Sequence, residues 1–168
     1  MEKHDATIAA DAFLSVQTAR AGLVKGESVA AGHADEITVS GWRWGMASNS
    51  DAAMRSNADG SAAARRSFRQ LVVEKNFDRA STGLMAACAT NDKVKQLVLT
   101  MRKAGDRQQD FLTITLTGAT LQEIDHVSDA TGNVRESLTF SFTHVDVEYR
   151  VQLPNGQVGA ATTFNADV

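Results

Sequence analysis

The sequence predicts one domain that is mainly β, organised as a barrel or closed sandwich with one short α-helix. Three observations support this fold class. Apolar and polar residues alternate over most of the chain after Phe13, one stretch departs from the alternation, and 168 residues suit a single domain. Alternation with a period of two is typical of strands that bury one face. We therefore expect residues 1–168 to fold together.

Composition and charge exclude several classes of protein. Hydrophobic residues make up 43% and charged residues 22% of the chain, a mixture that is typical of globular domains and excludes wholesale disorder. Lys and Arg number 17 against 20 Asp and Glu, so the net charge is -3. A general affinity for nucleic acids or anionic membranes requires an excess of positive charge. We expect neither as a partner.

The N-terminus and the apolar runs bear on where the protein is made. Residues 1–5 contain neither the basic nor the apolar region of a signal peptide. The longest apolar run, 84–89, is far shorter than the roughly 20 residues of a membrane-spanning helix. We expect a protein that folds in the cytoplasm and, if it is exported, leaves without a signal peptide.

The first predicted strand, 37–44, changes phase in its middle. Its apolar residues alternate in one phase before Gly41, whereas Trp42 and Trp44 fall in the opposite phase. We predict a bulge at Gly41 that keeps both tryptophans in the core, which is favoured over a ligand platform. Arg43 would then face outwards, because successive side chains of a strand point to opposite faces.

Two long segments, 25–35 and 46–65, show no periodicity. An irregular segment as long as the second is uncommon inside a compact domain and usually has a function. A third segment, 81–90, breaks the alternation differently and predicts a helix capped by Ser81. Its buried side would carry Leu84, Met85 and Cys88.

The clearest strands are 94–102 and 110–117, in which leucine or isoleucine alternates with polar residues. Residues 103–106 supply a turn, so the two strands are predicted to form a hairpin. From 136 to 150 the apolar positions switch from even to odd numbers near Thr143. We predict a bulge there, where the strand bends from one sheet towards another. Pro154 precedes a further turn.

Few residues point to chemistry. Cys88 with His126 or His144 would be the only nucleophile and base, but a lone cysteine on the apolar side of a short helix favours the core. The four histidines are scattered singly, without the short spacings of a closed zinc site. We expect no catalytic, cofactor-binding or metal-binding residue and no enzyme.

Arginines gather at and just after the second irregular segment: Arg55, Arg65, Arg66 and Arg69. Two interpretations are open. The arginines keep an exposed edge soluble, or they bind a carboxylate on another copy of the chain, for which the planar guanidinium gives specific geometry.

A series of short motifs resembles the Hcp tube proteins of bacterial type VI secretion systems. The motifs are VKGES at 24–28, EITV at 36–39, WRWGM at 42–46, DRAS at 78–81, LTMRKAG at 99–105 and QQDFL at 108–112. Similarity extends to 147–149 and 155–156, so that it spans roughly residues 12–159. Each motif is weak alone, but their common order is specific.

The resemblance implies a small β-barrel of two sheets with one helix and an extended loop. It implies a structural subunit of the type VI inner tube, a homohexameric ring that stacks on others and carries or chaperones secreted effectors in its lumen. The spike, sheath and baseplate of the apparatus are further implied partners. Segment 46–65 corresponds to the extended loop, which reaches an adjacent ring. Residues 1–11 are unmatched and are predicted to form a mobile arm.

One feature of this chain departs from the family at a position that bears on function. Arg43 stands where the family often has a small polar residue, at a position on the lumen wall, so six guanidinium groups would line each ring. Arg55, Arg65 and Arg66 are expected at contacts between rings or subunits. The alternatives are an effector-binding chaperone or phage-tail-tube-like protein that forms no secretion tube, and an enzyme that uses Cys88 and His126.

Overall fold

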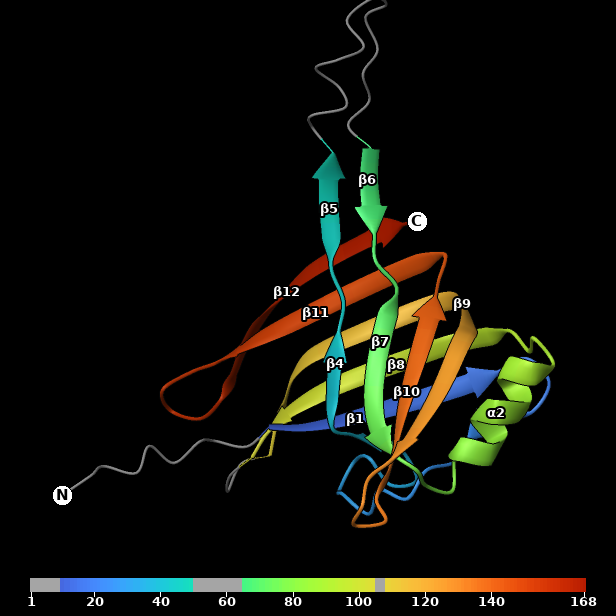
Figure 1. Ribbon diagram of the computed structural model, residues 1–168. Helices are drawn as coiled ribbons and strands as arrows, with labels where there is room; N and C mark the ends of the chain where they lie inside the picture. The colour runs from blue at the N-terminus through green and yellow to red at the C-terminus, as the bar shows by residue number, and fades with distance from the viewer. Residues whose placement is uncertain (1–9, 50–64, 105–107) are drawn as a thin grey trace, which may run out of the picture.

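The computed structural model describes residues 10–49, 65–104 and 108–168 (Figure 1). The strands are β1 (Ala10–Thr18), β2 (Gly22–Val24), β3 (Ile37–Val39), β4 (Gly41–Arg43), β5 (Met46–Asn49), β6 (Arg65–Phe68), β7 (Leu71–Asn76), β8 (Val94–Lys103), β9 (Asp110–Ser128), β10 (Val134–Ser141), β11 (His144–Gln152) and β12 (Val158–Asp167). One helix, α2 (Ser81–Ala89), lies within these ranges. The prediction of a mainly β fold with one short helix is confirmed.

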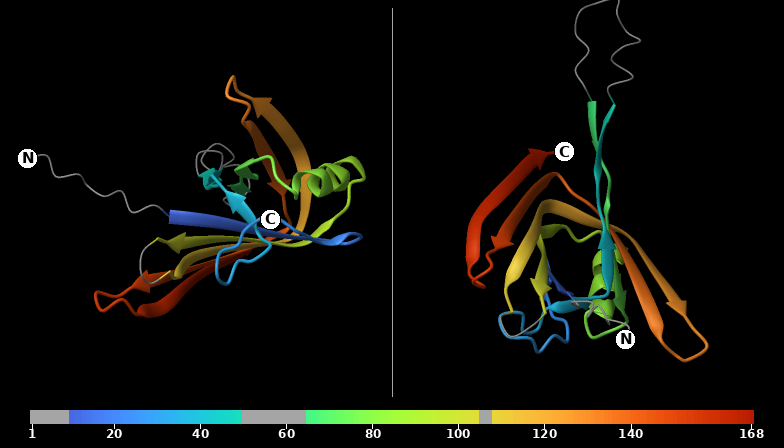
Figure 2. Two further views of the ribbon diagram at one scale, coloured as in Figure 1. Left: turned by 90° about the horizontal axis from the view of Figure 1, so that it is seen from below. Right: turned by 90° about the vertical axis from the view of Figure 1, so that its left-hand side faces the viewer.

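Ten of the strands form two antiparallel sheets that share β9, and β5 and β6 pair separately. Sheet A contains β1, β2, β3, β8, β11, β12 and residues 110–119 of β9. Sheet B contains β4, β7, β10 and residues 120–128 of β9. The two sheets meet at an angle along β9 (Figure 2). The predicted hairpin of 94–102 and 110–117 is confirmed as β8 and the first part of β9.

Gly118 marks the place where β9 passes from one sheet to the other. Its φ is +60°, in the left-handed region that favours glycine. Thr143 packs against it so closely that a Cβ on Gly118 would overlap the Thr143 hydroxyl. That hydroxyl also donates a hydrogen bond to the carbonyl of Thr117 at 3.1 Å. Two independent properties of glycine are therefore required at this position: its tolerance of a positive φ and the absence of a Cβ.

Both predicted bulges are instead breaks between strands of different sheets. Near Thr143 the chain leaves β10 in sheet B and enters β11 in sheet A. At Ser40 it leaves β3, which pairs with β1, and enters β4, which pairs with β7. The phase changes were predicted correctly, but their cause is a change of sheet rather than one inserted residue. Within the described residues the strand ladder stays open, and segment 37–43 links its two sides covalently.

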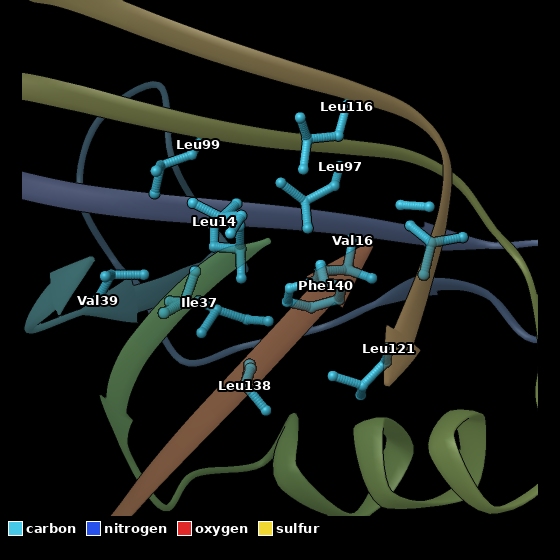
Figure 3. Packing of buried hydrophobic residues seen from close by; sticks show 14 of the residues in the cluster. Leu14, Val16, Ile37, Val39, Leu97, Leu99, Leu116, Leu121, Leu138 and Phe140 are labelled. Carbon is cyan, nitrogen blue, oxygen red and sulfur yellow. The ribbon is translucent and has the colours of Figure 1, made fainter. Parts of the chain in front are cut away.

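The core fills the angle between the sheets (Figure 3). Side chains with almost no exposure come from β1, β8, β9 and β10: Leu14, Val16, Leu97, Leu99, Leu116, Leu121, Leu138 and Phe140. Each such side chain contributes about 1.5–3 kcal/mol when it leaves water. Trp42 and Trp44 are partly buried and pack against this core, as predicted. Arg43 between them is exposed.

Helix α2 closes one end of the core, but its cap and its buried face differ from the prediction. Its N-cap is Ala80, and no side chain caps it. Ser81 is buried, and its hydroxyl accepts a hydrogen bond from the backbone N–H of Asp78 at 2.9 Å. Leu84 and Ala87 are buried, whereas Met85 is 43% exposed. The short helix turns only a narrow face towards the sheets.

The irregular segments and the termini are partly as expected. Residues 25–35 contain no strand or helix. The ends of 46–65 are regular, since β5 pairs with β6, and the pair rises beyond β4 and β7 (Figure 1). Residues 50–64, with Arg55, lie outside the described residues. Residues 10–11 belong to β1, so they are not part of an arm, and residues 1–9 lie outside the described residues.

Candidate functional site

One face of the β11–β12 hairpin begins in the core and becomes exposed towards the tip of the hairpin. Val145 is fully buried, and its neighbours on the same face of β11, Tyr149 and Val151, are 42% and 44% exposed. Phe164 on β12 lies opposite Val147 and is 37% exposed. Figure 2 shows the hairpin extending away from the sheets' junction. An apolar face that leaves the core in this way is typical of a surface that another molecule covers.

The outer strand of this hairpin also has an open edge. In the described chain β12 pairs with β11 alone, over the register from Asp167 to Val158. An edge strand of ten residues presents a row of backbone donors and acceptors that can pair with another strand. The apolar face and the open edge together form the hairpin surface, which we define as Tyr149, Val151, Phe164 and the edge of β12.

His144 fixes the end of β12. Its Nδ1 lies 2.6 Å from the carboxylate of Asp167, and its Nε2 lies 3.2 Å from that of Asp146. The hydrogen bond with Asp167 raises the pKa of His144 above its ordinary value, and the charge of Asp146 adds to the effect. The backbone N–H of Val168 donates to the carbonyl of Thr143 at 2.9 Å. The last residues of β12 are thus held onto the start of β11.

Arg43 lies beside a residue that is distant in the sequence, Arg69. Both line a hollow of about 410 Å³ together with Trp44, Gln70 and Val72. The pairing of β4 with β7 brings them together, because Arg43 lies opposite Val72 in that register. Sequence reasoning had grouped Arg69 with the loop arginines instead.

Arg65 and Arg66 lie on β6, away from this hollow. Arg66 is exposed and lies opposite Ser48 of β5. The backbone of Arg65 pairs with Asn49, and the position of its side chain is not described. Arg55 lies outside the described residues. The predicted arginine cluster is therefore split between the hollow and the β5–β6 pair, as far as the structure describes it.

A buried charge network, which sequence reasoning missed, joins sheet B to α2. Nζ of Lys75 lies 2.8 Å from Glu136 and 2.8 Å from Asp78, and it donates to the hydroxyl of Ser81 at 3.1 Å. The second carboxylate oxygen of Glu136 lies 2.7 Å from Nε2 of His126. For Glu136 the alternation itself carried a signal, because this residue shares the even phase of the apolar residues that follow it.

A second network surrounds His33, which is 6% exposed. Its ring stacks on Phe13 with centroids 4.3 Å apart, and Arg102 lies against the same Phe13 ring at 4.9 Å. Its two nitrogens lie 2.8 Å from Glu36 and 2.9 Å from Asp110. Burial alone would lower the pKa of His33, but the hydrogen bonds with Asp110 and Glu36 outweigh it, so the pKa is raised. The network ties segment 25–36 to the start of β9.

The residues considered for catalysis do not form a catalytic group. Cys88 is half-buried against the core. His126 binds Glu136 and His144 binds Asp167, and no hydrogen bond joins either histidine to Cys88 in the described chain. Over the same residues, no group of three His, Cys, Asp or Glu side chains is arranged to hold a metal ion. No helix in the described ranges is long and apolar enough to span a membrane.

Comparison with known proteins points to one family. A family model described as "Type VI secretion system effector, Hcp" matches residues 13–149. Protein hcp1 of Pseudomonas aeruginosa is 32% identical over 151 residues, which cover 89% of this chain and 88% of that protein.

Solved structures of similar proteins also match this chain over nearly its whole length. Hcp1 of Salmonella typhimurium covers 95% of each chain with a TM-score of 0.72 and 28% identity. A structure described as a type six secretion system protein covers 95% of this chain and 96% of its own, with a TM-score of 0.83 and 23% identity, a likeness of fold.

Proposed function

The chain belongs to the Hcp family of type VI secretion system proteins, and from this premise we propose that it forms homohexameric rings that stack into a tube and carry secreted effectors. Its function is then mechanical and protective, without bond-making chemistry. Repeated association of identical copies produces an enclosed lumen. The spike, the sheath and the baseplate are its proposed partners in the apparatus, through which we propose that it leaves the cell.

The hairpin surface is the observation that carries this proposal. A ring needs a heterologous contact, in which one face of each copy binds a different face of the next. The apolar residues Tyr149, Val151 and Phe164 and the free edge of β12 offer one half of such a contact. Covering them would continue the burial that begins at Val145 in the core.

The β5–β6 pair supports contact between rings. It rises beyond sheet B and begins the segment that corresponds to the extended loop of the family. We propose that Arg55, Arg65 and Arg66 bind carboxylates of a neighbouring ring or subunit. Arg66 is exposed on this pair and is available for such a contact.

Arg43 is proposed to face the lumen. It is exposed on β4, between two tryptophans that pack against the core, so its side chain points away from that core. Repeated around a ring, it would give the wall a circle of positive charge. Replacement of Arg43 by Ser is then expected to change the choice of effector and to leave ring formation intact.

Size-exclusion chromatography with light scattering tests the proposal. A mass about six times 18.0 kDa supports the ring, and a monomer at all concentrations contradicts it. Deletion of residues 50–64 then separates a tube subunit from a chaperone that forms no tube. Loss of stacking in electron micrographs, with the ring mass unchanged, supports the tube. Stacking that survives the deletion contradicts the proposed role of the loop.

A further inference from the structure

The two tryptophans differ in the partner that each indole N–H finds. Nε1 of Trp42 donates to Sδ of Met101 at 3.1 Å. Nε1 of Trp44 is buried and has no acceptor among the described residues. A buried donor without a partner costs about 1–3 kcal/mol. Such groups are rare in folded proteins, and a water molecule or a ligand can supply the missing acceptor.

The hollow beside Trp44 is lined by further donors. Arg43 and Arg69 are exposed and form no ion pair with a carboxylate in the described part of the chain. A guanidinium group donates hydrogen bonds and accepts none. Gln70 and Val72 complete the lining, and neither brings a negative charge. The lining of the hollow therefore holds two cations beside Trp44 and no acid.

The walls of this hollow are held in place before any ligand arrives. The backbone N–H of Arg69 donates to the carbonyl of Gly45 at 2.9 Å. Nη1 of Arg69 lies 3.9 Å from the position that a Cβ on Gly45 would take, so the guanidinium lies over the glycine that follows Trp44. The Trp44 ring packs against Phe142, with centroids 6.3 Å apart. The backbone and the Trp44 ring are therefore ordered beforehand, and binding has to order only the two exposed arginine side chains.

We propose that this hollow is a carboxylate-binding site that takes an exposed carboxylate of an effector polypeptide. Two arginines can hold the two oxygens of one carboxylate, and charge-assisted hydrogen bonds of this kind are the strong ones. Trp44 lines the same hollow, so its indole N–H lies near a bound carboxylate and reports its charge. The choice of an effector as the occupant rests on the proposed function, because Arg43 lines both the hollow and the proposed lumen wall.

The indole N–H resonances of the chain provide a direct test, since there are only two tryptophans. The full-length protein with ¹⁵N-labelled tryptophan is titrated with N-acetyl-glutamate amide and, separately, with N-acetyl-glutamine amide. We expect the Trp44 resonance to move downfield to saturation with the acid, with little response to the amide. The Trp42 resonance, whose N–H is bound to Met101, should stay in place.

Matched variants assign the effect to the hollow. Arg43→Ser and Arg69→Ser should each weaken binding of the glutamate probe by about tenfold, because each removes a charge-assisted hydrogen bond. Arg135→Ser removes an exposed arginine that does not line the hollow and should leave binding unchanged. A Trp44 resonance that does not move, or that responds equally to acid and amide, would overturn the site.

Light scattering on the same samples separates this inference from the proposed function. If the protein forms rings but the Trp44 resonance does not respond, the carboxylate site is contradicted and the proposed tube function is not. A saturable Trp44 response in a protein that stays monomeric supports the site and contradicts the ring. If the resonance of the ring already lies at the shifted position without a probe, a neighbouring copy fills the hollow, which overturns the effector as its occupant.

Discussion

Lys75 and Glu136 form an ion pair of 2.8 Å in which neither side chain is accessible to water. Removing one partner of such a pair leaves an uncompensated buried charge, which typically costs about 3–5 kcal/mol. We therefore expect Lys75→Met to lower the free energy of unfolding by about this amount. Urea denaturation at one protein concentration measures it. Lys95→Met, at an exposed position of β8, is the control and should change stability by less than about 0.5 kcal/mol. Equal stability of the two variants would contradict the buried pair.

The His33 network predicts a dependence of stability on pH. Its pKa in the folded protein is raised above 6.5, so its contribution is fully present below the ordinary pKa and is lost as the pH rises through the folded value. The stability difference between the wild type and His33→Gln should be largest in mild acid and should shrink towards alkaline pH. Urea denaturation from about pH 5 to about pH 9 measures this difference. A difference that stays constant over that range rules out the proposed titration.

Comparing Gly118 with Gly132 distinguishes the cost of backbone strain from the cost of a steric clash. Both have a positive φ, but a Cβ on Gly132 meets no atom within 4 Å, whereas one on Gly118 overlaps Thr143. We expect Gly132→Ala to cost about 1 kcal/mol for backbone strain, and Gly118→Ala to cost about 2 kcal/mol more because the strands must move apart. Thermal and urea unfolding compare the two. A smaller cost at Gly118 would mean that the junction of the sheets is loose.

The hairpin surface predicts which apolar residues matter for assembly. Tyr149→Ser and Phe164→Ser should each weaken self-association by about tenfold or more, because aromatic side chains at the centre of an interface carry much of its energy. Val127→Ser is the control, since Val127 is 65% exposed near the end of β9, outside the hairpin surface. Sedimentation over a range of concentrations measures the effect. If only Val127→Ser lost assembly, the interface would have to be assigned to sheet B and not to the hairpin surface.

Charge reversal on β6 tests the contact between rings. Arg65→Glu combined with Arg66→Glu should reduce stacking and leave the mass of single rings unchanged, because only the proposed contact between rings loses its cations. Electron microscopy and light scattering report the two properties separately. The same reversal at Lys95 is the control. Normal stacking in the double variant would assign the arginines to solubility alone.

Alternation predicted the strands well but not where they turn. The pattern in β8 and β9 depends on which side chains face the core, so the hairpin could be predicted from local sequence. The continuation of β9 to Ser128 could not, because it depends on the left-handed turn at Gly118 and on Thr143, which lies 25 residues further along the chain. Phase changes located the breaks near Ser40 and Thr143, but pairing partners decided that they were changes of sheet.

The sequence predicted the orientation of a single residue of the candidate site, but not which residues lie together. Arg43 was expected to face outwards from its phase between two tryptophans, and it does. Its neighbour Arg69 could not be assigned to the same hollow, because the register of β4 against β7 brings them together. Glu136 shares the even phase of the apolar residues that follow it, whereas Lys75 comes after three consecutive apolar residues without alternation, and neither has an evident partner until the strands are paired.

Because β9 belongs to both sheets, one strand connects the two halves of the molecule. Its 19 residues run through both sheets and turn at Gly118, so one covalent backbone joins the two halves of the molecule. A load on sheet A reaches β9 through the hydrogen bonds between its strands and then enters sheet B along the backbone of β9. The two sheets therefore cannot slide far past each other unless β9 itself unfolds.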